Sequence, residues 1–161
     1  MSDPAILTER LTKQYGSTTA VDELTLTVEG DEIYGFLGPN GAGKSTTIGM
    51  LMDYLRPTTG LISVLGQDPQ RDVVDVHSRI GILPDRYSLY GGLTARQHLE
   101  LVLDTKRVSD SPAELLDRVG LDAVDGQSVG TFSQGMEQRL ALAMALVGDP
   151  DLLVLDEPFT G

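Results

Sequence analysis

The amino-acid sequence predicts an α/β fold with an antiparallel β layer at the N-terminus, a mainly parallel core sheet and a small helical insert. Residues 5–11 and 24–28 alternate between apolar and polar side chains with a period of two, which is typical of half-exposed strands. Residues 33–37 form an apolar run before a glycine-rich loop, and apolar side chains over 45–55 then recur at helical spacing. Residues 152–155 are all apolar, as in strands that a parallel sheet buries on both faces.

The middle of the chain contains the signals of the helical insert. Thr94 and Gln97 have the spacing of a capping box, which predicts that a helix begins there. A second helix is expected after Ser111, because a proline occupies its first turn and Gly120 supplies a stop. These helices place the insert at about 94–130. Two further short apolar runs are typical of strands, at 61–65 and 80–83.

Composition limits the classes of function. The chain has 161 residues, enough for one domain with an apolar core, and no cysteine, which excludes disulfides and cysteine nucleophiles. The 24 acidic residues outnumber the 12 basic ones, so the formal net charge is -12 and no nucleic-acid partner is expected. The same acidic excess is compatible with an ordinary acidic soluble protein, but we favour adaptation to a high-salt cytoplasm, where screening makes it tolerable.

Hydropathy predicts a cytoplasmic protein. The longest apolar run, 140–147, is far shorter than the roughly 20 residues that a membrane span requires. The N-terminus has no basic segment followed by an apolar one, which is the pattern of a secretory signal.

The strongest motif is the glycine-rich loop that follows residues 33–37. Its eight residues, from Gly38 to Ser45, match the pattern G-x-x-x-x-G-K-[ST] of phosphate-binding loops. Glycines are needed there because backbone N–H groups must wrap closely around a phosphate. Lys44 would bring positive charge to the β- and γ-phosphates, and Ser45 would offer its hydroxyl to Mg²⁺. A chance glycine-rich turn is the alternative, but the expected strand, loop and helix are the context that the motif requires.

A pair of carboxylates follows the expected strand at 152–155. Asp156 comes directly after the strand and is expected to hold Mg²⁺, which leaves Glu157 as the catalytic residue that orients and polarises the attacking water. Such a pair is also common at the ends of buried strands. The phosphate-binding loop upstream is what favours the functional interpretation.

A third motif surrounds Ser133, which is expected to cap a helix that ends at Gly148. Residues 131–139, Thr-Phe-Ser-Gln-Gly-Met-Glu-Gln-Arg, resemble the signature motif of the ATP-binding subunits of ABC transporters. Those subunits have a P-loop NTPase fold, and their signature precedes the Asp-Glu strand, as it does here. The resemblance implies that Ser133, Gln134 and Gly135 bind the ATP of a second ATP-binding subunit in a head-to-tail dimer. A plain helix cap is the alternative for this segment alone.

The resemblance also implies the rest of a nucleotide site. Tyr15 matches the aromatic residue that stacks on adenine, and Val21, with Ala20, matches the apolar contact after it. Asp85 stands where the family has a glutamine near the metal, and its shorter carboxylate has less reach and adds negative charge. The implied ATP-binding residues are Tyr15, Val21, Gly38, Pro39, Asn40, Gly41, Ala42, Gly43, Lys44, Ser45 and Thr46. The implied metal ligands are Ser45, Asp156 and Asp85.

For function, the resemblance implies an ATPase that uses ATP and Mg²⁺ to power export through a separate membrane permease. The chain would then lie on the inner face of the cell membrane, bound to that permease. The segments at 37–40, 89–94 and 134–136 are most similar to the exporter branch, the ABC-2-like transporters. Two alternatives stay open: a soluble ABC ATPase that acts on ribosomes or DNA, and a nucleotide-binding remnant without turnover.

The family pattern continues beyond Gly161. Members of the family have a further Leu-Asp loop, a switch histidine and more strands and helices. Neither His77 nor His98 takes the place of that histidine, because both precede the signature. We therefore expect residues 1–161 to be a single ABC ATP-binding domain that is incomplete at its C-terminus, with an exposed sheet edge at 152–155.

Overall fold

The computed structural model describes residues 3–158, and the chain divides into two compact units, residues 1–77 and 78–161. Both units combine strands with helices, so the predicted α/β class is confirmed. No helix within residues 3–158 is both long enough and apolar enough to span a bilayer.

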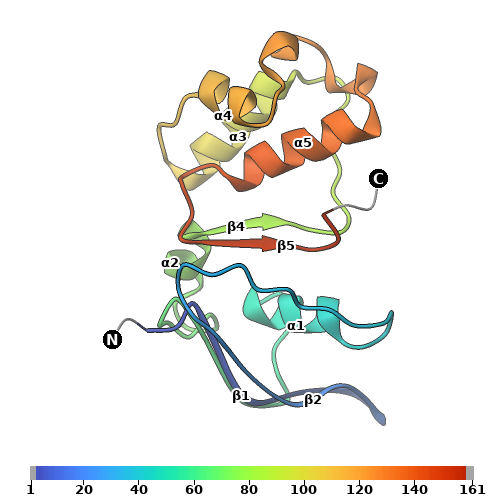
Figure 1. Cartoon of the computed structure of the whole chain (residues 1–161), viewed down its shortest axis with the longest axis vertical. Coiled ribbons are helices and arrows are strands. Elements are labelled where there is room, and N and C mark those ends of the chain that lie inside the picture. The colour runs from blue at the N-terminus through green and yellow to red at the C-terminus, as the bar shows by residue number, and fades with distance from the viewer. Residues whose placement is uncertain (1–2, 159–161) are drawn as a thin grey trace. The chain divides into compact units, whose positions relative to one another are not determined.

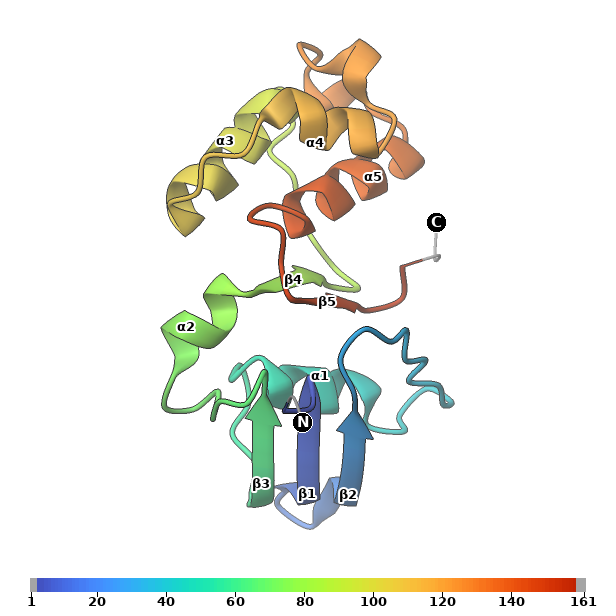
Figure 2. The same cartoon turned by 60° about the vertical axis from the view of Figure 1, so that its left-hand side comes forward.

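The first unit contains a three-stranded antiparallel sheet in the order β2-β1-β3. β1 (Ile6–Tyr15) and β2 (Thr18–Val28) form a hairpin, and β3 (Thr59–Val64) pairs with the other edge of β1 (Figure 2). The expected N-terminal β layer is therefore confirmed. Its strands run further than the alternation indicated, because the hairpin pairing continues to Tyr15 and Thr18.

The helix after the glycine-rich loop is shorter than expected. α1 spans Lys44–Leu51, whereas its apolar spacing continues to residue 55. Met52 caps its C-terminus, and Asp53 has a φ of 50°, a left-handed conformation that stops the helix. The apolar periodicity continues past the break because Leu55 still packs against Gly49.

The strand expected at 33–37 is not formed, and this prediction is wrong for the described structure. The side chains of Ile33 and Leu37 are almost fully exposed. Within residues 3–158, no strand pairs with residues 33–37. An extended segment without a neighbouring strand forms no interstrand hydrogen bonds, so it is not stabilised as a strand. The apolar pattern alone could not supply the missing neighbour.

The second unit contains a two-stranded parallel sheet. β4 (Ile80–Leu83) and β5 (Leu152–Leu155) pair in register from Ile80 opposite Leu152 to Leu83 opposite Leu155. α5 (Gln134–Ala145) covers this sheet, as Figure 1 shows. Leu83 packs against Ala141 and Ala145 of the helix. Gly81 leaves room for this approach, since a Cβ there would overlap the Ala145 carbonyl oxygen.

The composition of β5 is typical of a strand buried on both faces, but the exposed sheet edge expected at 152–155 is confirmed for the described residues, where β5 pairs with β4 alone. Leu153 is 36% exposed and Leu155 38% exposed. Both lie on the sheet face that carries Leu83, because residues paired directly across strands share a face. α5 packs chiefly over β4, so the β5 side of this face is left uncovered.

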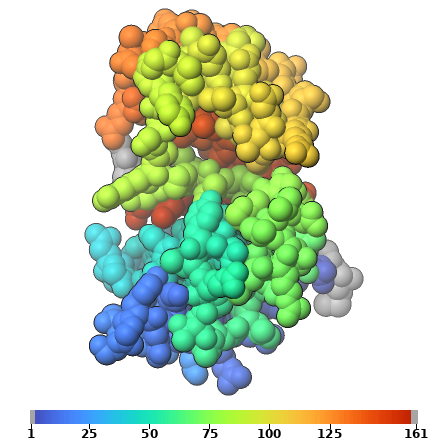
Figure 3. Space-filling model, turned by 180° about the vertical axis from the view of Figure 1, so that it is seen from behind, coloured from blue at the N-terminus to red at the C-terminus, as the bar shows by residue number. Residues whose placement is uncertain are grey.

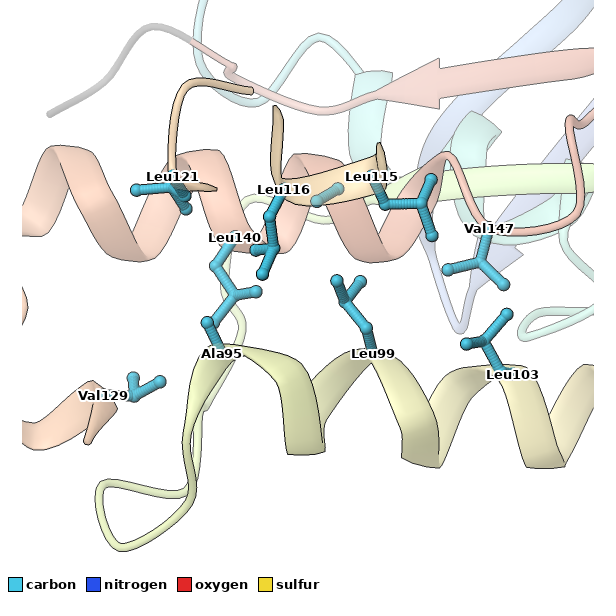
Figure 4. Close-up of a cluster of buried hydrophobic side chains, with 10 residues drawn as sticks. Ala95, Leu99, Leu103, Leu115, Leu116, Leu121, Val129, Leu140 and Val147 are labelled. Atoms are coloured by element: carbon cyan, nitrogen blue, oxygen red, sulfur yellow. The ribbon is translucent and has the colours of Figure 1, made fainter. Parts of the chain in front are cut away.

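The remaining helices of the second unit form a bundle with α5. α3 (Ala95–Lys106) begins at the predicted capping box of Thr94 and Gln97, and the Ser111 hydroxyl accepts from the Glu114 amide to cap α4 (Pro112–Arg118). Two short 3-10 turns follow, Asp122–Val124 and Val129–Thr131. Leu99 and Leu103 of α3 point toward side chains of α4 and α5 (Figure 4). Figure 3 shows the outer surface of this bundle in yellow and orange.

One helix had no signal in the sequence. α2 (Val73–Ser78) is short, and Val76 is its only buried residue. Within this helix, the His77 Nε2 atom lies 2.9 Å from the Met52 carbonyl oxygen, and the ring packs edge-on against Tyr54. His98 is fully buried in α3, where its two ring nitrogens bond the Tyr90 amide and the Thr94 carbonyl.

Candidate nucleotide site

The glycine-rich loop of the first unit has the backbone shape that close phosphate contact requires. Gly41 has a φ of 83° and Gly43, the N-cap of α1, has a φ of 86°. A Cβ on Gly43 would overlap the Ala20 carbonyl oxygen and lie 3.0 Å from Val21 Cγ2. Only glycine fits position 43, because both the left-handed backbone and the packing on β2 exclude a side chain.

Lys44 folds back across this loop. Its Nζ atom donates to the carbonyl oxygens of Gly38 at 2.8 Å and Pro39 at 3.2 Å. The amides of Gly43, Lys44 and Ser45 have no acceptor among residues 3–158. Unpaired amides at a helix N-terminus and an ammonium beside them form an anion site.

The first turn of α1 fits this interpretation. It contains no acidic residue, although acidic side chains are the usual stabilising choice there. Ser45 is exposed and Thr46 half-buried at the same helix end. Thr47 is buried, and its hydroxyl donates to the Gly43 carbonyl at 3.0 Å, which fixes the loop to the helix. The loop residues Pro39, Asn40 and Ala42 form its exposed rim.

The β1–β2 hairpin carries both predicted base-contacting residues, and it places Val21 next to the loop. Val21 is 7% exposed and lies directly against Gly43. Tyr15, at the end of β1, is 49% exposed. The Lys13 Nζ atom lies 5.1 Å from the Tyr15 ring centroid, and no sequence motif had singled this lysine out.

A small hollow in the second unit brings together several of the other predicted residues. Asp85, Gln134, Asp156 and Glu157 line it, with Leu83, Pro84, Tyr87 and Gln138. Asp156 is anchored at the end of β5, since its amide donates to the Leu83 carbonyl at 2.8 Å. Glu157 has a φ of 54°, and the Gln138 side-chain amide bonds the carbonyl oxygen of Pro158 just beyond it.

The signature residues occupy the N-terminus of α5. The Ser133 hydroxyl accepts from the Met136 amide at 3.3 Å, so the predicted cap is confirmed. Gly135 leaves this end of the helix open, because nothing lies within 4 Å of where its Cβ would be. Of Ser133, Gln134 and Gly135, Gln134 is the one that borders the hollow.

Tyr87 is a residue of the hollow that sequence reasoning missed. Burial raises the pKa of its hydroxyl, and the nearby Glu137 carboxylate raises it further. Its ring packs against the cluster of Leu83, Ala141 and Ala145. Asp85, two residues before it, makes an exposed ion pair with Arg86 at 3.8 Å. Nothing in the spacing of this segment indicated a packed tyrosine.

Comparison with known proteins identifies the family. The family model described as ABC transporter matches residues 21–160 of this chain. The chain belongs to the ABC transporter family. It is 43% identical over 158 residues to the bacitracin transport ATP-binding protein BcrA of Bacillus licheniformis, covering 97% of this chain and 52% of that protein. It is 43% identical over 162 residues to the daunorubicin/doxorubicin resistance ATP-binding protein DrrA of Streptomyces peucetius, covering 98% and 49%.

The fold of this ABC chain agrees with solved structures. A structure of the ATP-binding subunit of an ABC transporter matches it with a TM-score of 0.86 at 28% identity, over 97% of this chain and 67% of that one. A second match is cbiO1 from Clostridium perfringens, part of the ABC transporter complex cbiONQ, with a TM-score of 0.82 at 25% identity; it covers 99% of this chain and 67% of that one. The chain spans about half the length of the curated relatives described above.

The residues expected to bind magnesium lie in both units of this ABC chain. The Ser45 hydroxyl in the first unit, and the carboxylates of Asp85 and Asp156 in the second, are hard oxygen donors of the kind Mg²⁺ prefers. No cluster of three or more acidic, histidine or cysteine side chains that could hold a metal occurs in the described part of the chain. A sparse set still suits Mg²⁺, which usually binds one or two protein ligands together with phosphate and water.

Proposed function

We propose that this chain is the ATP-binding and ATP-hydrolysing part of an exporter-type ABC transporter, and that its two units form one ATP-binding domain. The observation that carries the proposal is the loop around Lys44, which combines left-handed glycines at 41 and 43, unpaired amides at the start of α1 and the Lys44 ammonium. The names of the relatives, which concern bacitracin transport and daunorubicin resistance, support the transport role.

In this proposal the loop from Gly38 to Thr46 binds the triphosphate through its amides and through Lys44. Tyr15 and Val21 contact the base. Ser45, Asp156 and Asp85 would hold Mg²⁺, which supplies positive charge against the phosphate oxygens.

The catalytic step is assigned to Glu157. Its carboxylate accepts a hydrogen bond from water and orients that water toward the γ-phosphate. The backbone at Glu157 is held on both sides, by Asp156 through Leu83 and by Pro158 through Gln138. A fixed backbone limits the positions that the carboxylate can take, as a base that must address one water requires.

The partners follow from the signature. Ser133, Gln134 and Gly135 present an open, capped helix N-terminus, which suits the γ-phosphate of ATP held by a second ATP-binding subunit. A head-to-tail dimer of such subunits, bound to a membrane permease at the inner face of the membrane, completes the proposed transporter.

Binding is tested by calorimetric titration of the chain with Mg-ATP. Lys44→Ala removes the charge at the phosphates, and the affinity is expected to fall at least about tenfold, as for other hydrogen bonds to charged groups. Arg71→Ala is the matched control, because Arg71 is an exposed cation of the same unit with no part in the loop. Equal affinities of Lys44→Ala and wild type would contradict the proposal.

Turnover is tested by phosphate release. Glu157→Gln keeps the shape of the side chain and removes its basicity, so we expect Mg-ATP binding to persist while release falls about 100-fold or more. Unchanged release by Glu157→Gln would remove Glu157 from the catalytic role. Binding without any release by wild-type chain would instead select the remnant alternative.

A further inference from the structure

We propose that Lys13 is a positioning residue for the nucleotide base, acting through Tyr15. This inference rests on the proposed function, because it assigns the ring of Tyr15 to adenine. Lys13 itself touches no part of the triphosphate in this proposal.

Lys13 is held by two contacts that lie far apart in the sequence. Its Nζ atom donates to the Arg56 carbonyl oxygen at 2.6 Å and lies 5.1 Å from the Tyr15 ring centroid. Arg56 belongs to the segment between α1 and β3. The ammonium therefore fastens the Tyr15 ring to a main-chain atom outside the hairpin. An aromatic ring attracts an ammonium most strongly when the ammonium lies over the ring face, so this contact favours one orientation of the Tyr15 ring.

The strand register places this pair on the side of the glycine-rich loop. Lys13 lies directly opposite Val21 across the hairpin, and residues paired in this way point to the same sheet face. Val21 on that face packs against Gly43. Lys13, which contacts the half-exposed Tyr15 ring, therefore shares a sheet face with the residue that packs against the phosphate loop.

The Tyr15 ring needs such support because it stands at the edge of the hairpin. The turn follows at once with Gly16, whose φ is 58°. A half-exposed ring there has several rotamers available, and stacking on a base would have to select one of them. The ammonium on one ring face selects an orientation in advance and leaves the opposite face for adenine.

The experiment compares two ligands by calorimetry with the whole chain: Mg-ATP, which contains the base, and Mg-tripolyphosphate, which does not. Lys13→Met removes the charge and keeps most of the stem. Its affinity for Mg-ATP is expected to fall about two- to fivefold, as for an exposed cation–π contact. Its affinity for Mg-tripolyphosphate is expected to stay unchanged.

Three further variants test whether Lys13 acts by orienting the Tyr15 ring or only by adding positive charge near the nucleotide. Arg56→Met removes a neighbouring exposed positive charge but keeps the carbonyl that accepts from Lys13, so we expect wild-type affinities. Lys13→Arg retains a cation at the ring and should restore Mg-ATP binding. In a Tyr15→Ala background, Lys13→Met should have no further effect.

The proposal is overturned if Lys13→Met weakens both ligands equally, or if its effect persists without the Tyr15 ring. Wild-type affinity of Lys13→Met for Mg-ATP also overturns it. If Lys44→Ala still abolishes binding in that case, the proposed function stands and only this inference fails. Unfolding midpoints of all variants, measured in parallel, show that each one is folded under the conditions of titration.

Discussion

Substitution of Gly43 by alanine separates two physical requirements of the glycine-rich loop. The first is backbone conformation, because a left-handed residue with a Cβ costs about 1–2 kcal/mol. The second is packing, because the new Cβ would come closer than 3.0 Å to the Ala20 carbonyl oxygen, a separation that real Cβ contacts essentially never show. The Ala20 backbone would have to shift by several tenths of an ångström, and overpacking of this kind typically costs about 1–3 kcal/mol more.

Gly41→Ala is the matched control for this substitution. Gly41 has nearly the same φ, 83° against 86°, but nothing lies within 4 Å of where its Cβ would be. Gly41→Ala should therefore lower the free energy of unfolding only by the backbone contribution, about 1–2 kcal/mol, whereas Gly43→Ala should lower it by about 2–5 kcal/mol in total. Against the 5–15 kcal/mol typical of a whole domain, the larger loss is severe.

The assay is urea unfolding of the wild type and the two variants, with Mg-ATP titration of each under folded conditions. We expect the free energy of unfolding to fall in the order wild type, Gly41→Ala, Gly43→Ala, with unchanged m-values. We also expect Gly43→Ala to lose nucleotide affinity, since a shifted loop no longer aims its amides at one point. Equal destabilisation by the two variants would refute the packing of Gly43 on β2, and stronger destabilisation by Gly41→Ala would refute the whole comparison.

Two predictions concern pH and salt. Burial lowers the pKa of the Lys106 ammonium, with Asp110 partly opposing it, so the unfolded chain binds more protons at this site and the free energy of unfolding should rise with pH toward the ordinary lysine value of about 10.4. Urea unfolding between about pH 8 and about pH 10 should give a steeper rise for the wild type than for Lys106→Met, and parallel curves would contradict this. A net charge of -12 destabilises the folded chain through repulsion between its acidic side chains, and salt at about 1 M screens this repulsion beyond about 3 Å. The unfolding midpoint should therefore rise from low to multimolar KCl. Equal midpoints at both salt concentrations would remove the basis for a high-salt adaptation.

Helix starts were predictable from the sequence because their signals are local. Thr94, Ser111 and Ser133 each accept a hydrogen bond from the amide three residues further on. Such a bond is formed within one turn and depends little on the rest of the fold. The alternation at 5–11 and 24–28 is likewise local, and it predicted the antiparallel layer but not that β1 and β2 continue to a short turn at Gly16.

Features that depend on distant neighbours were not predictable in the same way. The apolar run at 33–37 has the composition of a strand, but a strand forms only where another one offers its backbone groups. Leu153 and Leu155 have the composition of a buried strand, and only the resemblance to a longer family pattern indicated an exposed edge; which side chains are exposed depends on α5, which packs chiefly over β4. Residue type sets what a side chain gains on burial, and the covering element decides whether that gain is realised.

The candidate site divides along the same line. A phosphate-binding loop must be contiguous, because consecutive amides have to converge on one group, so Gly38 to Ser45 could be recognised from their order alone. Lys13, which in our proposal positions Tyr15, is held by the carbonyl oxygen of Arg56, 43 positions further along the chain. Gln138 holds a carbonyl 20 positions away, beside Glu157. Supporting residues of this kind leave no spacing signal, since any element that passes nearby can supply them. For this reason the groups that contact the nucleotide can be proposed from sequence motifs, whereas those that hold them in position emerge only from the tertiary contacts.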